Sequence, residues 1–288
     1  MTAVLGDEVV AATSATATSG MSRRGALALR LLRPLASAAL SLGIVVLLWL
    51  AFVKGFNLNP LVAKSPSDVW HFFTHGGAEG QPASRVWSGL GKTLTDSGVG
   101  LVSGLAAAIV VSVGFVLSRT IESALLPLAI VIRSVPIVAI VPLVALIFGR
   151  GLTCTAVISG TITFFPALVT MTYGLRSTSN LAADLCRAYG ADGRTVVRKV
   201  MLPSALPAIF AAARVAVPGA LVGATLAEFF ATGKGLGYQI FSDAQQFSYD
   251  SVWAGTAVLT LVSVVAYYVV AALENVVLAR FGPAPTGR

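Results

Sequence analysis

The chain contains several apolar runs that are long enough to cross a lipid bilayer. The first, from Leu35 to Val53, carries no charged residue over about 19 positions, and a helix of that length spans the hydrocarbon core. Of the 288 residues, 56% are hydrophobic and 11% are charged, whereas charged residues make up about a quarter of a soluble domain. The sequence therefore predicts an all-α integral membrane protein.

We expect about six membrane-crossing helices, at residues 34–53, 94–118, 122–148, 152–174, 206–230 and 252–273. The third is interrupted by Arg133-Ser134-Val135-Pro136 and again at Pro142, and the fifth carries Pro207 and Pro218. Proline removes a backbone donor and bends a membrane helix where neighbouring helices satisfy the freed carbonyl.

The distribution of basic residues predicts the orientation in the membrane. Six crossings place both termini on one side, together with the loops near 119 and 176–199, and that side holds 12 of the 20 basic residues against 6 on the other. By the positive-inside rule the first side is cytoplasmic, which includes a disordered basic tail at 1–33 and a second tail at 276–288. Because the net charge of +8 is spread over these loops, it does not indicate a nucleic-acid partner.

One short polar segment, residues 180–207, lies between two of the apolar runs on the predicted cytoplasmic side. Leu181 to Tyr189 is good helical sequence, and Gly190 can end that helix in the left-handed conformation. Asp192 can cap a second short helix, which Pro203 ends. On composition alone, this segment could equally be an amphipathic helix that rests on anionic lipid.

The spacing in this segment resembles the EAA loop of permease subunits in bacterial ABC importers. Asp184-Leu185-Cys186 is followed by three residues, Gly190, nine residues and Val200-Met201-Leu202-Pro203. The family pattern is E-A-A, three residues, G, nine residues, I-x-L-P, so the interval is kept and the opening triplet departs from it. A helix that only rests on lipid has no reason to keep this interval. We call residues 180–207 the EAA-like segment.

Three further stretches are similar to permeases for nitrate, sulfonates, taurine and related small solutes. They are Lys64-Ser65-Pro66-Ser67-Asp68-Val69, the Ile132–Pro136 stretch with Phe148-Gly149, and Ala227-Glu228-Phe229 with Gly235-Leu236-Gly237-Tyr238. The resemblance covers most of residues 34–275 and implies a permease domain with the type I ABC importer fold.

The resemblance also implies partners and residue roles. Family members use two permease copies, two ATP-binding subunits and an external solute-binding protein, in the bacterial inner membrane. ATP and Mg²⁺ are bound by the partner, so we expect no cofactor, no metal site and no enzymatic activity in this chain. Eight residues of the EAA-like segment are then expected to shape or contact the ATPase docking site: Asp184, Leu185, Cys186, Gly190, Val196, Val200, Leu202 and Pro203. Val196 and Val200 would supply the apolar contact.

Two charged residues within predicted spans need a partner or a water-filled path. Arg133, beside Pro136, either faces the pathway and attracts an anionic solute, or pairs with Glu228 or backbone carbonyls and holds the kink. Glu228 is the only carboxylate expected well inside a span. Asp96 and Arg214 fall near span ends, where they can reach the interface.

Two other classes of function remain open. An ion-coupled secondary transporter would carry coupling carboxylates near the bilayer centre, and a membrane scaffold or sensor would need no ATPase. Three local patterns do not indicate chemistry. Ser88–Thr93 lacks the first glycine of a phosphate-binding loop, His71 and His75 lack a third zinc ligand, and Gly233–Gly237 lacks the flanking strand of a dinucleotide site and is typical of an outer loop. Cys154 and Cys186 fall on opposite sides, so we expect no disulfide.

Overall fold

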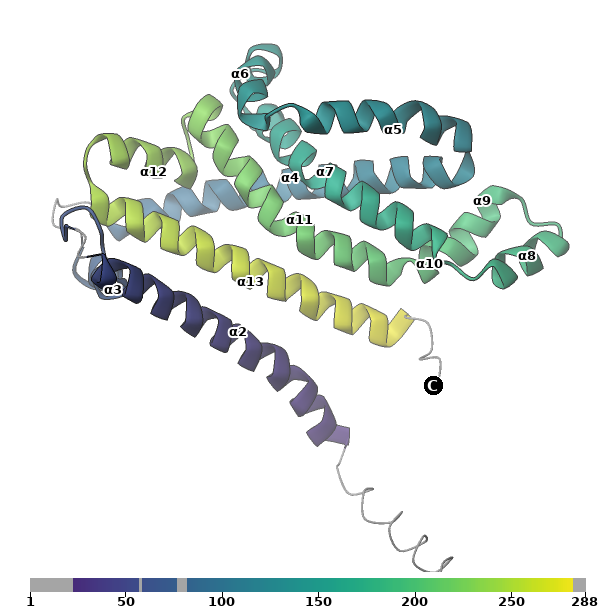
Figure 1. Cartoon of the computed structure of the whole chain (residues 1–288), viewed down its shortest axis with the longest axis horizontal. Coiled ribbons are helices and arrows are strands. Elements are labelled where there is room, and N and C mark those ends of the chain that lie inside the picture. The colour runs from purple at the N-terminus through teal and green to yellow at the C-terminus, as the bar shows by residue number, and fades with distance from the viewer. Residues whose placement is uncertain (1–22, 57–58, 77–81, 282–288) are drawn as a thin grey trace, which may run out of the picture. The chain divides into compact units, whose positions relative to one another are not determined.

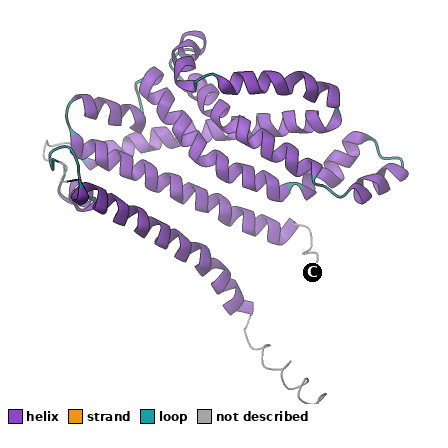
Figure 2. Ribbon diagram, viewed as in Figure 1, coloured by secondary structure: helices purple, strands orange, loops and turns teal. Residues whose placement is uncertain are grey.

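The computed structural model describes residues 23–56, 59–76 and 82–281, with side chains from residue 39 onward except that of Asn180. The chain forms two compact units, which divide between residues 58 and 59. Within the described residues every regular element is helical (Figure 2). Residues 1–22 of the predicted N-terminal tail lie outside the described residues. Its remaining residues, 23–33, are not disordered but form the start of helix α2 (Arg23–Gly55).

The second unit is a helical bundle (Figure 1). Four of its helices are long and apolar enough to cross a membrane: α4 (Ala83–Leu117), α7 (Leu152–Arg176), α11 (Leu206–Ala227) continued by η2 (Glu228–Thr232), and α13 (Tyr249–Phe281). The pair α5 (Arg119–Ser134) and α6 (Ile137–Phe148) passes the same criterion together, and α2 has a shorter apolar part, Ala39–Gly55. This set is roughly consistent with the six predicted crossings.

The predicted third crossing is two helices joined at a sharp bend of 102°. Val135 takes an extended conformation (φ −76°, ψ 128°), as expected for a residue that precedes proline. Pro136 is the residue directly before α6, where its missing N–H interrupts no helical hydrogen bond. The expected second interruption is wrong, because α6 continues through Pro142, and α11 likewise continues through Pro218.

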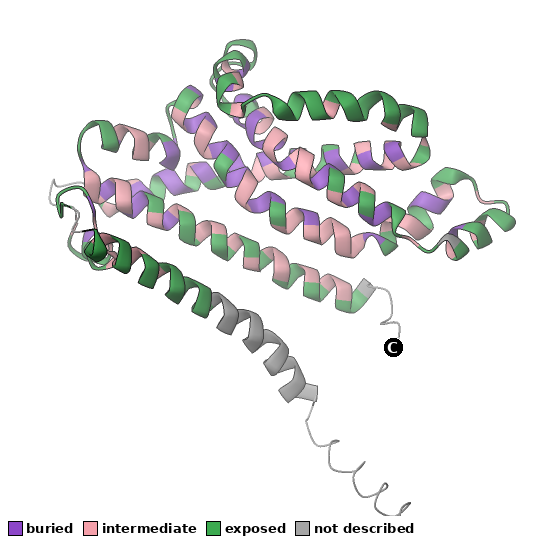
Figure 3. Ribbon diagram, viewed as in Figure 1, coloured by how far each residue is buried: buried purple, intermediate pink, exposed green. Residues whose placement is uncertain are grey.

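Helices α4, α7 and α11 form the centre of this unit through small residues that bring their backbones close. A Cβ atom at Gly100 of α4 would lie 2.0 Å from Ser159 Oγ of α7, and one at Gly223 of α11 would lie 2.5 Å from Ser159 Cα. The Ser159 hydroxyl donates a hydrogen bond to the Ala220 carbonyl at 2.8 Å. Such packing replaces the hydrophobic effect as the force between membrane helices. Buried residues follow these three helices, whereas α5 has none (Figure 3).

The two ends of this unit carry different short elements (Figure 1). The EAA-like segment forms one end, with α8 (Asn180–Ala188), α9 (Gly193–Val196), the π-helical turn η1 (Val197–Met201) and α10 (Leu202–Ser204). At the other end, α3 (Pro66–His75) and α12 (Leu236–Gln245) pack on α4 and α13 around Phe72, Leu90, Leu236 and Ala254. Because α11 begins next to α10 and η2 ends before α12, one continuous element joins the two ends.

Candidate functional site

The EAA-like segment consists of two helical parts, as the sequence predicts. The second part, however, does not end at Pro203, because α10 continues through this proline to Ser204. Gly190 has φ +83°, and its N–H donates to the Arg187 carbonyl at 2.8 Å, which ends α8. Asp192 caps α9 by accepting the Thr195 N–H at 3.0 Å. Hydrogen bonds from the side chain and backbone of Thr195 lower the pKa of the Asp192 carboxyl below its ordinary value.

The two parts of this segment differ in exposure. Leu181, Leu185 and Tyr189 of the first part are 80%, 58% and 85% exposed. Asp184 is exposed and forms an ion pair with Arg187 at 2.9 Å, and Cys186 is half-buried. Exposed apolar side chains beside a charged pair are typical of a surface that another protein or a membrane covers.

The structure changes the expected role of Val196. This side chain is 1% exposed and Val197 is 5% exposed, so both pack inside the subunit. Val200 and Leu202 are half-buried, and Pro203 is exposed at the start of α10. Val196 therefore holds the segment to its own subunit and offers no surface to a partner. The sequence pattern marks an apolar stripe here but cannot tell which protein the stripe contacts.

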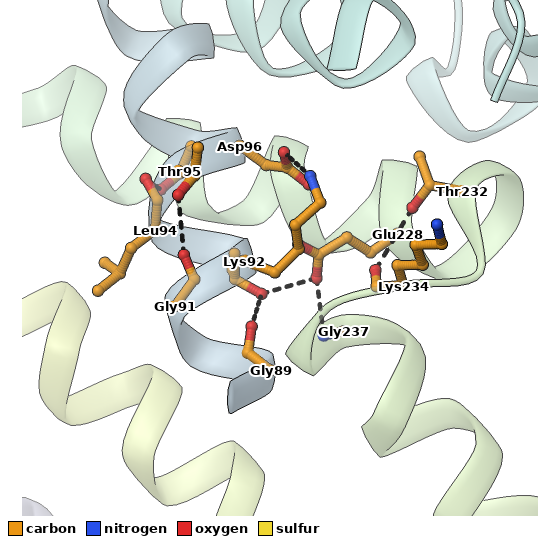
Figure 4. A network of polar contacts seen from close by, with 12 residues as sticks. Gly89, Gly91, Lys92, Leu94, Thr95, Asp96, Glu228, Thr232, Lys234 and Gly237 are labelled. Atoms are coloured by element: carbon orange, nitrogen blue, oxygen red, sulfur yellow. Dashed lines mark hydrogen bonds and ion pairs between the residues drawn. The ribbon is translucent and has the colours of Figure 1, made fainter. Parts of the chain in front are cut away.

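Glu228 lies at the opposite end of the unit, in a buried polar network (Figure 4). Its side chain is fully buried, and Oε2 accepts hydrogen bonds from the Thr93 hydroxyl and the Gly237 N–H, both at 2.8 Å. Thr93 Oγ1 in turn accepts the Leu236 N–H at 2.9 Å. These bonds join α4, η2 and the start of α12.

Two expectations about buried carboxylates are wrong, namely that Asp96 reaches the interface and that Glu228 is the only carboxylate well inside a span. Asp96 is fully buried within α4 and forms an ion pair with Lys92, so it does not reach the interface (Figure 4). Glu228 is consequently not the only buried carboxylate inside a long helix. Arg214, also expected to reach the interface, pairs with Glu274 of α13 at 3.2 Å. In each case the charge is balanced by a partner inside the protein, as charges within membrane helices generally are.

Arg133 does not pair with Glu228, which corrects the second alternative for this residue. Its side chain is exposed at the end of α5, and it forms no ion pair or hydrogen bond with the described residues. It borders two cavities, a larger one that runs along α5 and α7 and a smaller one at the α5–α6 bend. The larger, of about 260 Å³, is also lined by Phe165, Tyr173 and Arg176, and the smaller is lined by Pro166 and Ile137. Pro136 sits at the bend and shapes this region.

The three patterns set aside in the sequence have structural explanations. Ser88–Thr93 is part of continuous helix α4, so its backbone N–H groups cannot cradle a phosphate. His71 and His75 stack at 4.4 Å on α3, and no group of three metal-binding side chains occurs among the described residues. Gly233–Gly235 is the turn between η2 and α12. Both cysteines are free, and Cys154 is buried.

Comparison with known proteins identifies the class. The chain belongs to the family described as the binding-protein-dependent transport system inner membrane component, whose profile matches residues 100–278. It is 30% identical over 241 residues to a probable ABC transporter permease protein of Haemophilus influenzae, covering 83% of this chain and 94% of that protein.

Two other relatives carry more specific names. The formylaminopyrimidine transport permease protein ThiX of Halalkalibacterium halodurans is 29% identical, over 68% of this chain and 78% of its own length. The taurine transport system permease protein TauC of Escherichia coli is 26% identical, over 77% of this chain and 82% of its own length. The chain is thus a multi-pass membrane permease of the type I ABC importer family.

Proposed function

We propose that this chain imports a small solute across the bacterial inner membrane, driven by a separate ATP-binding subunit that docks on the EAA-like segment. An external binding protein would deliver the solute, and two permease copies would enclose its path. The single observation that carries the docking site is the exposed apolar face of α8, formed by Leu181, Leu185 and Tyr189. We assign the apolar contact to these residues in place of Val196, and we keep Asp184, Gly190 and Pro203 as residues that shape the segment.

Two observations favour transport driven by ATP over a secondary transporter and over a membrane scaffold. A secondary transporter would use its buried carboxylates for ion coupling, but Asp96 is neutralised by Lys92 and Glu228 is hydrogen-bonded to backbone and threonine. A scaffold would leave the family match without explanation. Under the proposal, both termini and the EAA-like segment lie on the cytoplasmic side, where ATP is available.

The experiment that tests the docking site compares two leucines at opposite ends of the described unit. Leu185→Asp introduces a charge into the proposed interface, while Leu61→Asp alters a leucine that is 72% exposed in the turn before α3. We expect Leu185→Asp to abolish copurification of the ATP-binding subunit and Leu61→Asp to leave it unchanged, because a buried unpaired charge costs several kcal/mol at an interface, roughly 2–5. If no ATPase copurifies with the unaltered chain in mild detergent, the function itself is wrong.

Arg133 supports a more specific proposal about the solute. We infer that this residue lies on the pathway and favours a solute with a small anionic group. Taurine is a suitable probe, because it carries a sulfonate. A charge exposed to lipid costs a few kcal/mol, so an unpaired arginine at membrane depth indicates water or a polar solute beside it. The cavity between α5 and α7 and the smaller one at the α5–α6 bend provide that space.

The test of this proposal is uptake of labelled taurine by cells that carry the complete transporter. Arg133→Gln removes the charge and Arg133→Lys keeps it. We expect about tenfold slower uptake with glutamine and a smaller loss with lysine, since one well-placed charge contributes about 1.5–3 kcal/mol to anion binding. Unchanged uptake by a stably assembled Arg133→Gln transporter would end the anion hypothesis.

A further inference from the structure

A polar joint fastens helix α12 to the rest of the bundle. The joint consists of Thr93 on α4, Glu228 on η2, and the backbone N–H groups of Leu236 and Gly237 at the start of α12. Figure 4 shows Glu228 and Gly237 of this joint. Thr93 is central, because its hydroxyl donates to Glu228 and accepts from Leu236, so that one side chain contacts both other elements.

The residues of the joint are buried and closely packed. Thr93 and Glu228 are both fully buried, and Leu236 is 1% exposed. A Cβ atom at Gly235 would lie 2.2 Å from the Glu228 carboxyl carbon, and one at Gly237 would lie 2.8 Å from the Thr225 carbonyl oxygen. Gly235 also has φ +96°, which favours glycine. The turn therefore fits against Glu228 only with glycine at these two positions.

The joint is also at the end of an element that starts at the EAA-like segment. Helix α11 begins at Leu206, directly after α10 and Ala205, and η2 continues it to Thr232. The last turn of this element is π-helical and contains Glu228, and such turns often occur at functional positions. Because α11 passes directly into η2, a displacement at one end of the element can be transmitted along it to the other end.

We propose that Thr93 and Glu228 are positioning residues that make α12 move together with α4 and α11, so that movement imposed on the EAA-like segment reaches the opposite end of the subunit. This inference rests on the proposed function, in which that opposite end receives the binding protein. The joint acts through α12 and has no contact with solute in this assignment.

The test uses a matched pair of threonines on one helix. Thr93→Val removes the central hydroxyl while keeping the side-chain shape, and Thr93→Ser restores it. Thr95→Val is the control, because the Thr95 hydroxyl bonds only to the Gly91 carbonyl of its own helix, at 2.9 Å (Figure 4). Two measurements are made: hydrogen exchange of the backbone over residues 233–240 in the permease without partners, and stimulation of ATP hydrolysis by the binding protein in the complete transporter.

We expect Thr93→Val to speed exchange over 233–240 by about fivefold to tenfold, since Leu236 loses its acceptor and Glu228 a donor. We also expect loss of stimulation by the binding protein with basal ATP hydrolysis retained, and recovery of both readouts in Thr93→Ser. A purely local packing role would lower basal hydrolysis and assembly together. If Thr93→Val does not accumulate, Glu228→Gln is measured in the same way, with a smaller change in the same direction.

Two results would overturn the inference: unchanged exchange over 233–240 in Thr93→Val or Glu228→Gln, and equal loss of stimulation in Thr95→Val. Failure of the proposed function is a different result. If exchange changes as expected but no ATPase associates with the unaltered permease, then the joint holds α12 in place and the chain is not driven by ATP.

Discussion

Single residues set the geometry of the EAA-like segment through backbone requirements. Gly190 adopts φ +83° at a place where a Cβ atom would meet no other atom within 4 Å, so its demand for glycine comes from backbone strain and not from packing. Asp192, two residues later, begins α9 by accepting the Thr195 N–H. Both features follow from local sequence, and both act on the angle between the two helical parts.

The cap at Asp192 gives a prediction with a pH dependence. We expect Asp192→Ala to speed hydrogen exchange of the Thr195 amide, because the amide loses its acceptor. Since the pKa of Asp192 is lowered in the folded chain, its stabilising effect is present above the ordinary aspartate value and is lost as pH falls through the lowered value, below about 4. The unaltered chain should therefore approach the Asp192→Ala exchange rate only in that acid range. A difference between the two that disappears already well above the ordinary aspartate value would contradict this account.

At the scale of helices, close approach at small residues holds α4, α7 and α11 together. Gly100, Gly223 and Ser159 meet at the crossing, and larger residues there would separate the helices. Glu228 and Arg133 show the same dependence on tertiary neighbours, since their surroundings come from elements far away in the sequence. The resemblance marks both stretches, but only the fold separates the buried carboxylate from the exposed arginine.

Two glycines of α4 provide a direct comparison of this packing. We expect Gly100→Ala to lower the free energy of unfolding by about 1–3 kcal/mol, because its Cβ atom would overlap Ser159. Gly98→Ala should be neutral or stabilising by up to about 1 kcal/mol, because a Cβ atom there meets nothing within 4 Å and alanine favours helix. Thermal unfolding in detergent measures both variants. Equal effects of the two would show that helix propensity, and not the crossing, decides stability.

At the scale of the whole molecule, the single subunit leaves an exposed arginine and a helix without buried residues. Helix α5 has no buried residue, and Arg133 at its end is exposed beside the cavities. Lipid is a poor neighbour for an arginine, and the proposed second copy, which would enclose a watery path between the subunits, would cover this residue and α5.

We therefore expect the purified transporter to contain two copies of this chain and two ATP-binding subunits. Native mass spectrometry of the complex from mild detergent measures this stoichiometry directly. The Leu185→Asp variant should give permease without ATP-binding subunits, and the Leu61→Asp variant should give the full complex. A complex with one permease copy would contradict the enclosed path.

The sequence by itself determined the membrane class, the family and the local shape of the EAA-like segment, because apolar length, motif spacing, a left-handed glycine and a helix cap are properties of neighbouring residues. It could not determine where Val196 points, that Asp96 is buried, or whether Arg133 meets Glu228. Those outcomes depend on residues far apart in the sequence, as does the hydrogen bond between Thr93 and Leu236, which are 143 positions apart. Only the tertiary structure decided them, because burial and pairing of a side chain are set by the helices that pack around it.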